Sequence, residues 1–155
     1  MKTAYVVMIV AAVALIAGPA AMAQDAKAEA QWLTSLDEAK AAAQKAGKPI
    51  LVDFTGSDWC GWCIKLRKEV FDTPEFSAWA AKNVVLCELD FPRQKKQDEA
   101  TKKANNELAK TYGVKGFPTI VFVSADGKEI GRSGYKPGGP KAWTDSADAI
   151  LKKAK

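Results

Sequence analysis

The sequence contains no histidine among its 155 residues. This absence excludes Ser–His–Asp hydrolysis, nucleophilic catalysis by a Cys–His pair, and zinc sites that mix cysteine with histidine. A covalently attached c-type haem is excluded as well, because Ile64 stands where the motif Cys-x-x-Cys-His needs its histidine. A copper site built from two cysteines and a distant histidine is excluded in its usual form.

Cysteine is scarce, with three residues in the whole chain. Three thiolates cannot complete an all-cysteine zinc site, which needs four ligands. Cys60 and Cys63 are separated by two residues, whereas Cys87 stands alone in the apolar segment 84–90. We expect Cys87 to be a small buried hydrophobic residue that is remote from Cys60, since free cysteines are mostly buried. The alternatives for Cys87 are an intermolecular disulfide and a secondary redox role.

A basic stripe is also lacking, although the formal net charge is +5. The lysines are scattered and mixed with acidic residues, and no aromatic residues are interleaved with them, so nucleic-acid binding is not expected. The most polar segment, residues 93–99, is interpreted as a surface loop that leads into a helix. An alternative interpretation is a basic docking patch for an acidic partner.

The N-terminal 23 residues have the pattern of a secretory signal peptide. Lys2 is followed by an apolar run over 4–17, and Ala21-Met22-Ala23 fits the small-x-small cleavage rule. The mature chain would begin at Gln24 in the periplasm or outside the cell, without stable membrane association, where disulfides form and persist. The alternative is an uncleaved membrane anchor, for which the apolar run is short.

Two cysteines lie where a predicted strand gives way to a predicted helix. The apolar run 50–54 predicts a buried strand, and residues 64–70 predict a helix. The free N–H groups at a helix start stabilise a thiolate, so we expect a lowered pKa for Cys60. Cys63 is three residues further on the same helical face, within reach of a disulfide. Taken alone, the pair could equally be half of a zinc site or a structural disulfide.

Three separated motifs together resemble the thioredoxin superfamily, in particular its exported bacterial thioredoxin-like proteins. They are Val52-Asp53-Phe54, Trp59-Cys60-Gly61-Trp62-Cys63 and Gly116-Phe117-Pro118-Thr119, in this order. The resemblance runs from Ser35 to the C-terminus. It implies an α/β thioredoxin-like fold in which a central mixed β-sheet is flanked by helices on both faces. We therefore expect a domain over residues 35–155, preceded by a lead-in over residues 24–34.

The local patterns predict the order helix, strand, long broken helix, strand, helix, hairpin, helix. Within the lead-in, Trp32-Leu33 could form an edge strand or dock on the core. The predicted elements are a helix capped by Ser35 that ends at Gly47, a strand at 50–54, a helix from 64 that is restarted at 72–75, a strand at 84–90, a helix at 99–112, a hairpin of 120–123 and 128–132, and a helix at 141–153.

Asp53 is a charged residue inside the apolar strand. The resemblance implies a buried carboxyl group beneath the two cysteines, with a raised pKa, that accepts the proton of Cys63. The alternative is a polar residue at the strand end that faces solvent. The linker 55–58 is one residue longer than in the common thioredoxin pattern, which affects the separation of Asp53 from Cys63. Within it, Asp58 is expected to be a loop or helix-cap residue.

Five further residues are expected to line the site and bind substrate. Trp59 would shield the cysteine pair, although generic core packing is an alternative, and Gly61-Trp62 fills the dipeptide between the cysteines. The resemblance implies a cis peptide bond at Phe117–Pro118, facing the cysteines. There the backbone of Phe117 would pair with an extended substrate.

The resulting functional hypothesis is thiol–disulfide exchange on exported proteins. Cys60 would attack and Cys63 would resolve the mixed disulfide, without a metal or organic cofactor because the cysteines carry the electrons. The partners would be protein thiols and disulfides and a second redox protein that resets the pair; we expect a monomer. Exported proteins of this kind are often reductases, which favours reduction, while oxidase and isomerase activities stay open. The rival hypothesis is a binding module in which Cys60–Cys63 is a static structural disulfide.

Overall fold

The computed structural model describes residues 30–153. The predicted signal peptide, residues 1–23, and the predicted mature start at Gln24 lie outside this range. Within residues 30–153, no helix combines the length and the apolar character needed to cross a membrane.

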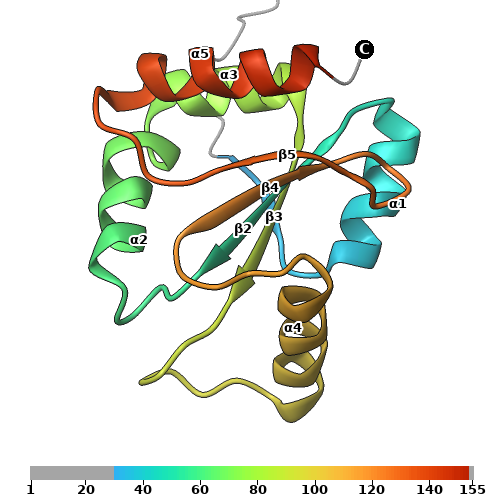
Figure 1. Ribbon diagram of the computed structural model, residues 1–155, viewed down its shortest axis with the longest axis vertical. Helices are drawn as coiled ribbons and strands as arrows, with labels where there is room; N and C mark the ends of the chain where they lie inside the picture. The colour runs from blue at the N-terminus through green and yellow to red at the C-terminus, as the bar shows by residue number, and fades with distance from the viewer. Residues whose placement is uncertain (1–29, 154–155) are drawn as a thin grey trace, which may run out of the picture.

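The centre of the fold is a five-stranded mixed sheet (Figure 1). Its strands are β1 (Trp32–Leu33), β2 (Ile50–Thr55), β3 (Val85–Asp90), β4 (Thr119–Val123) and β5 (Glu129–Ser133). The spatial order is β1-β3-β2-β4-β5, with β1, β3 and β2 parallel and β4 and β5 antiparallel to their neighbours. The predicted mixed sheet is thus confirmed. Trp32–Leu33 is an edge strand, so the sheet includes the end of the segment expected to be a lead-in.

Several helices begin or end at a residue whose side chain or backbone conformation stabilises that helix end. They are α1 (Leu36–Ala46), α2 (Gly61–Leu66), η1 (Arg67–Phe71), α3 (Pro74–Asn83), α4 (Glu99–Thr111) and α5 (Gly139–Lys152). Ser35 caps α1 by accepting the N–H of Glu38, and Asp98 caps α4 by accepting the N–H of Thr101. Gly47 ends α1 in the left-handed conformation at φ 62°, as its position in the sequence predicts.

The long helix after the cysteines is broken, as expected, and the break contains a π-turn. The α-helix α2 passes into the π-helical segment η1 at Arg67. Thr73 then caps α3 by accepting the N–H of Phe76, and Pro74 occupies the first turn. A π-turn inserts an extra residue into the helix, so it changes the direction in which the following side chains point.

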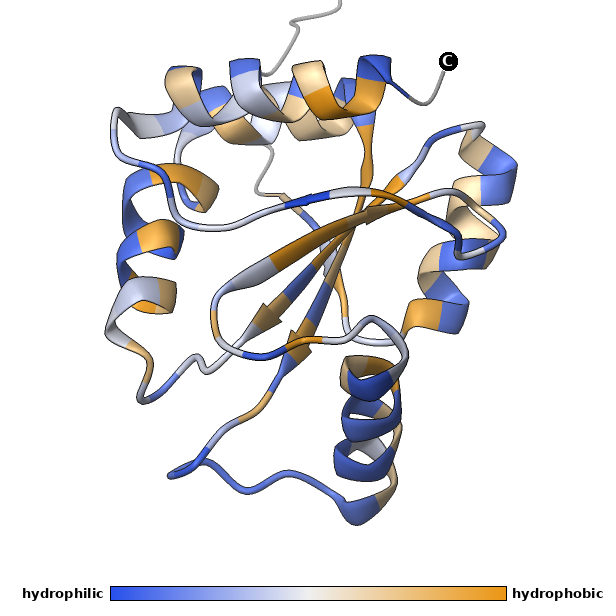
Figure 2. Ribbon diagram, in the orientation of Figure 1, coloured by the Kyte–Doolittle hydropathy of each residue, from blue (hydrophilic) through white to orange (hydrophobic). Residues whose placement is uncertain are grey.

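The two faces of the sheet carry separate hydrophobic clusters because side chains alternate along each strand. Figure 2 shows much of the central strands in the orange of hydrophobic residues, whereas the helices carry both orange and blue residues. On one face, Leu51 and Leu86 pack with residues of α2, η1, α3 and α5. On the other face, Val52, Phe54 and Cys87 pack with α1 and residues around α4. Helices on both faces confirm the predicted layering, and the sheet separates Cys87 from the helix that carries Cys63.

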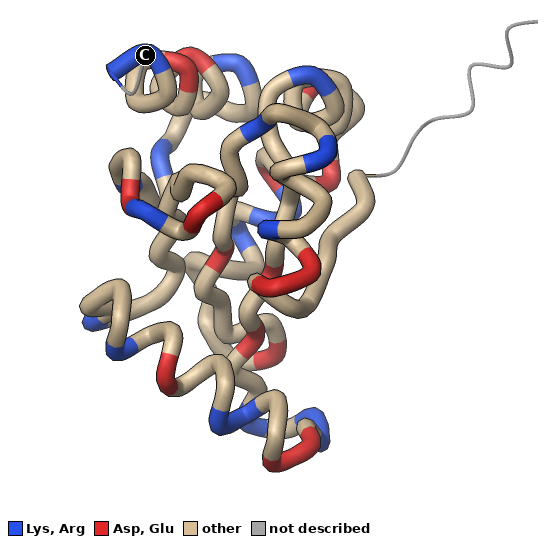
Figure 3. The backbone as a smooth tube through the Cα atoms, turned by 90° about the vertical axis from the view of Figure 1, so that its right-hand side faces the viewer, with Lys and Arg blue, Asp and Glu red and all other residues tan. Residues whose placement is uncertain are grey.

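Charged residues of both signs are interspersed along the backbone (Figure 3). The exposed pairs include Lys40–Asp37, Lys102–Glu99 and Lys141–Asp145, each within one turn of a helix. Exposed pairs of this kind contribute about 0 to 1 kcal/mol each. The net positive charge is therefore distributed over several elements.

Candidate active site

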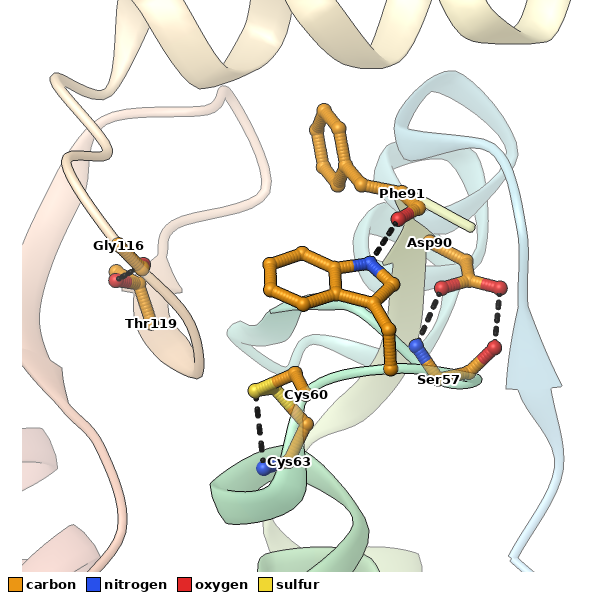
Figure 4. Close-up of a disulfide and its surroundings, with 8 residues drawn as sticks. Ser57, Cys60, Cys63, Asp90, Phe91, Gly116 and Thr119 are labelled. Carbon is orange, nitrogen blue, oxygen red and sulfur yellow. Dashed lines mark hydrogen bonds between the residues drawn. A yellow bond between two sulfur atoms is a disulfide. The ribbon is translucent and has the colours of Figure 1, made fainter. Parts of the chain in front are cut away.

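The cysteine pair lies just past the end of β2, at the start of α2 (Figure 4). Cys60 and Cys63 form a disulfide, with their Cα atoms 5.2 Å apart. Cys60 is the N-cap residue of α2, which confirms its predicted place at the first turn. Both residues are mostly buried, and Cys60 is the more accessible of the two.

At the start of α2, one backbone N–H group points toward one of the two sulfur atoms. The N–H of Cys63 points at Sγ of Cys60, with an N–S distance of 3.2 Å. In the reduced protein, the same N–H and the positive end of the helix would face a thiolate on Cys60. This arrangement favours Cys60 as the attacking sulfur.

Asp53 is a buried carboxyl group on the face of the sheet that α2 covers. Its side chain is 3% exposed, and its Oδ1 atom has no hydrogen-bond partner. Alternation along β2 places it on the same face as Leu51, which packs beneath α2. Burial raises the pKa of Asp53 to about 7, while Arg67 lowers it and Asp90 raises it. The alternative of a solvent-facing residue is therefore wrong.

Trp59 is held by three contacts beside the cysteine pair. Its indole N–H donates a 2.8 Å hydrogen bond to the carbonyl of Phe91. The Phe117 ring meets it edge-on at 5.9 Å between centroids, and the guanidinium of Arg93 lies 3.5 Å from its ring centroid. Trp59 therefore connects the loop before the cysteines with the loop that contains Phe117.

Trp62 is an exposed ring next to the disulfide. Its side chain is 58% exposed, and Ile64 on the same helix is also exposed. The Trp62 ring lies 5.0 Å from that of Tyr135, and the ammonium group of Lys65 lies 5.3 Å from both rings. Trp62 and Tyr135 thus form a small aromatic cluster beside the cysteines, with Lys65 next to it.

The peptide bond between Phe117 and Pro118 is cis, as the resemblance implies. Phe117 packs against Phe91 and Trp59, so this loop is held beside the loop of the cysteine pair. Figure 4 shows Gly116 and Thr119, the residues on either side, joined by a hydrogen bond from the Thr119 hydroxyl to the Gly116 carbonyl. The structure thus places the motif Gly116-Phe117-Pro118-Thr119 beside the loop that carries Trp59 and the cysteine pair.

Hydrogen bonds to a distant part of the chain hold the linker before the cysteines, and local sequence patterns did not predict them. The carboxylate of Asp58 accepts backbone N–H groups from Arg93, Gln94 and Lys95. The carboxylate of Asp90 accepts both the N–H and the hydroxyl of Ser57 (Figure 4). Asp58 is thus a loop residue that caps a second loop. The sequence gave one partial indication of this role, since an aspartate beside a tight turn commonly accepts hydrogen bonds from backbone N–H groups.

Cys87 is free and fully buried on the opposite face of the sheet. Burial raises the pKa of its thiol to about 12, and the charges of Asp53 and Glu38 add to this effect. A buried thiol with a raised pKa agrees with the expected packing role. Among residues 30–153, no three histidine, cysteine, aspartate or glutamate side chains gather as metal ligands would.

A mixed sheet with helices on both faces, a disulfide at a helix start and a cis-proline loop beside it define the class of thioredoxin-fold thiol–disulfide oxidoreductases. Residues 36–143 match the Thioredoxin-like domain family, and the chain belongs to it. It is 40% identical over 127 residues to the disulfide bond reductase DsbH of Chlamydia pneumoniae, covering 82% of this chain and 76% of that protein.

Structural comparison agrees with this assignment. A solved structure described as DsbH oxidoreductase matches with a TM-score of 0.76 and 39% identity, covering 81% of this chain and 86% of that chain. The thiol:disulfide interchange protein DsbD of Klebsiella pneumoniae is 36% identical over 90 residues, 58% of this chain and 14% of that much longer protein. The chain is thus a thiol–disulfide oxidoreductase of the thioredoxin superfamily.

Proposed function

We propose that the protein reduces disulfide bonds of exported proteins through the Cys60–Cys63 pair. The observation that carries this proposal is the position of Cys60, whose sulfur faces the N–H of Cys63 at the start of α2. The similarity to a protein named as a disulfide bond reductase favours the direction of reduction. The predicted signal peptide, residues 1–23, supports an exported location.

The reaction would proceed in two steps that balance electrons and protons. The Cys60 thiolate attacks the substrate disulfide, forming a mixed disulfide and releasing one substrate thiolate, which takes a proton from water. Cys63 then transfers its proton to Asp53 and attacks Sγ of Cys60, which forms the Cys60–Cys63 disulfide and breaks the bond between Cys60 and the substrate sulfur. The second substrate sulfur leaves as a thiolate and takes a proton from Asp53 or water. The two electrons come from the protein, so neither a metal nor an organic cofactor is needed. A reduced redox partner must restore the dithiol.

Substrate binding would use the residues around the pair. The backbone of Phe117 and Pro118 offers an extended edge for a polypeptide, and Trp59 and Trp62 provide apolar contact. Gly61 leaves space above the first helical turn, since a Cβ built on it would have no atom within 4 Å. These contacts favour a polypeptide over a small disulfide as substrate.

The test is reduction of insulin disulfides by the dithiothreitol-reduced protein. We expect activity in the wild type, none in Cys60→Ser, and a trapped mixed disulfide in Cys63→Ser. Cys87→Ser is the matched control, because Cys87 lies on the opposite face of the sheet, and it should keep its activity. An inactive wild type with an intact fold would instead favour the binding module with a static disulfide.

The direction is tested by equilibrating the Cys60–Cys63 pair with glutathione. A reductase requires a pair that is more reducing than the glutathione couple, and a strongly oxidising pair would overturn this direction while leaving the reaction class intact. Sequencing the N-terminus of the secreted protein tests its location, with Gln24 as the expected first residue.

A further inference from the structure

Beneath the helix that carries the cysteines, two acidic residues stand side by side in the sheet. Asp53 of β2 is the register partner of Glu88 in β3. Paired residues of neighbouring parallel strands point to the same face, and here that is the face covered by α2 and η1. Two acidic side chains at this position would repel each other in a buried environment unless a cation balances them.

Arg67 supplies this cation from the first residue of η1. Its guanidinium forms an ion pair with the Glu88 carboxylate and lies 3.8 Å from Asp72. It also lies over the ring of Trp32, 4.9 Å from the centroid. Its side chain is 33% exposed, so its charge is only partly screened by water. The contacts with Glu88, Asp72 and Trp32 hold the guanidinium in place. One guanidinium can make all three because it is planar and has several N–H donors.

The charges that act on Asp53 come from every element around it. Arg67 of η1 lowers the pKa of Asp53, and Asp90 of β3 raises it. Glu88 is the register partner of Asp53 in β3, and the neutral Cys87 thiol lies on the other face of the sheet. Of these groups, Arg67 alone favours the ionised form of Asp53. Because burial opposes ionisation, the loss of this one charge would leave Asp53 protonated at neutral pH.

We propose that Arg67, anchored by Glu88, is a positioning residue whose charge keeps Asp53 able to accept a proton at neutral pH. The inference rests on the proposed function, in which Cys63 must lose its proton before it attacks the mixed disulfide. A protonated Asp53 cannot accept that proton. Arg67 does not touch the reacting sulfur atoms, so it acts through Asp53.

The direct test is a ¹³C NMR titration of the Asp53 carboxyl carbon in the oxidised protein. In Arg67→Met, the pKa of Asp53 should rise by roughly 1 unit, a typical effect of a neighbouring charge. Arg67→Lys should restore much of the shift. Lys68→Met is the matched control: it removes the same charge from the next residue of the helix, which is exposed, and it should leave the titration unchanged.

A second variant gives an effect of opposite sign. Glu88→Gln removes a negative charge from beside Asp53 and leaves the Arg67 charge uncompensated, so the pKa of Asp53 should fall. Loosened packing would move both variants in the same direction, and that result would overturn the proposal. An unchanged titration in Arg67→Met would also overturn it.

The kinetic test compares pH profiles of insulin reduction. The profile of Arg67→Met should shift to higher pH, and this shift should vanish in the Asp53→Asn background. A shift that persists without Asp53 would show that Arg67 acts elsewhere. Because the titration needs no turnover, an inactive wild type would refute the proposed function while the electrostatic inference could still be measured.

Discussion

The ring of Trp59 lies so close to Gly56 that a Cβ atom built on Gly56 would stand 2.6 Å from Cε2 of the indole. Gly56 also accepts the N–H of Cys60 through its carbonyl, at 2.9 Å. It directly follows β2, which ends at Thr55. The missing side chain at Gly56 thus lets the indole of Trp59 pack against the backbone at this position.

Gly56→Ala should therefore displace Trp59 from its position beside the cysteines. A side chain forced into a packed site costs about 1 to 3 kcal/mol. We expect this loss in urea denaturation, together with a changed tryptophan fluorescence and slower insulin reduction. Gly116→Ala is the control, because its Cβ would meet no atom within 4 Å and should alter stability little. Equal stability of the two variants would contradict the close packing.

Asp58 should control the order of the loop that it caps. Backbone N–H groups, with that of Arg93 first, lower the pKa of Asp58, so this carboxylate stabilises the fold above its ordinary pKa. The stabilisation should be lost as the pH falls through the lowered value. In Asp58→Ala, the amides of residues 93–95 should exchange with deuterium faster at neutral pH. Asp145→Ala on α5 should leave their exchange unchanged.

Asp53 should make the fold less stable as the pH rises. Because its pKa is raised from 3.8 to about 7, the folded state keeps a proton that the unfolded chain releases between these values. The free energy of unfolding should thus fall over this window, by at most on the order of 4 kcal/mol.

The corresponding experiment is urea denaturation of Asp53→Asn and wild type below and above this window. The variant should gain stability relative to wild type as the pH rises, and should reduce insulin more slowly because the proposed proton acceptor is absent. A stability difference that does not change with pH would show that Asp53 has an ordinary pKa.

Trp62 should contribute to substrate binding and little to stability. Its ring is mostly exposed, and surface substitutions usually change stability by less than about 0.5 kcal/mol. In Trp62→Ala, KM for insulin should rise several-fold, whereas the rate with a small aromatic disulfide should change little. An equal loss with both substrates would indicate an effect on the cysteines themselves.

Much of the fold followed from local patterns. The strand 50–54, the cap at Ser35, the helix end at Gly47 and the helix restart at 72–75 depend on nearby residues alone, so periodicity and capping rules located them. The position of Cys60 at a helix start is equally local. The role of the Phe117–Pro118 motif came from the resemblance, since no local rule places a proline beside a distant cysteine.

The sequence by itself limited the chemistry: the absence of histidine excluded several reaction classes, and the three motifs that resemble the thioredoxin superfamily indicated thiol–disulfide exchange. Only the tertiary structure decided what surrounds those sulfur atoms. Glu88 and Arg67 are separated from Asp53 in the chain, and the register of β2 with β3 and the packing of η1 on the sheet bring them together. Likewise, Asp58 reaches residues 93–95 only because parallel pairing of β2 and β3 aligns the loops that follow them. Strand register depends on contacts between segments that are distant in the chain, and local sequence patterns carry no information about those contacts.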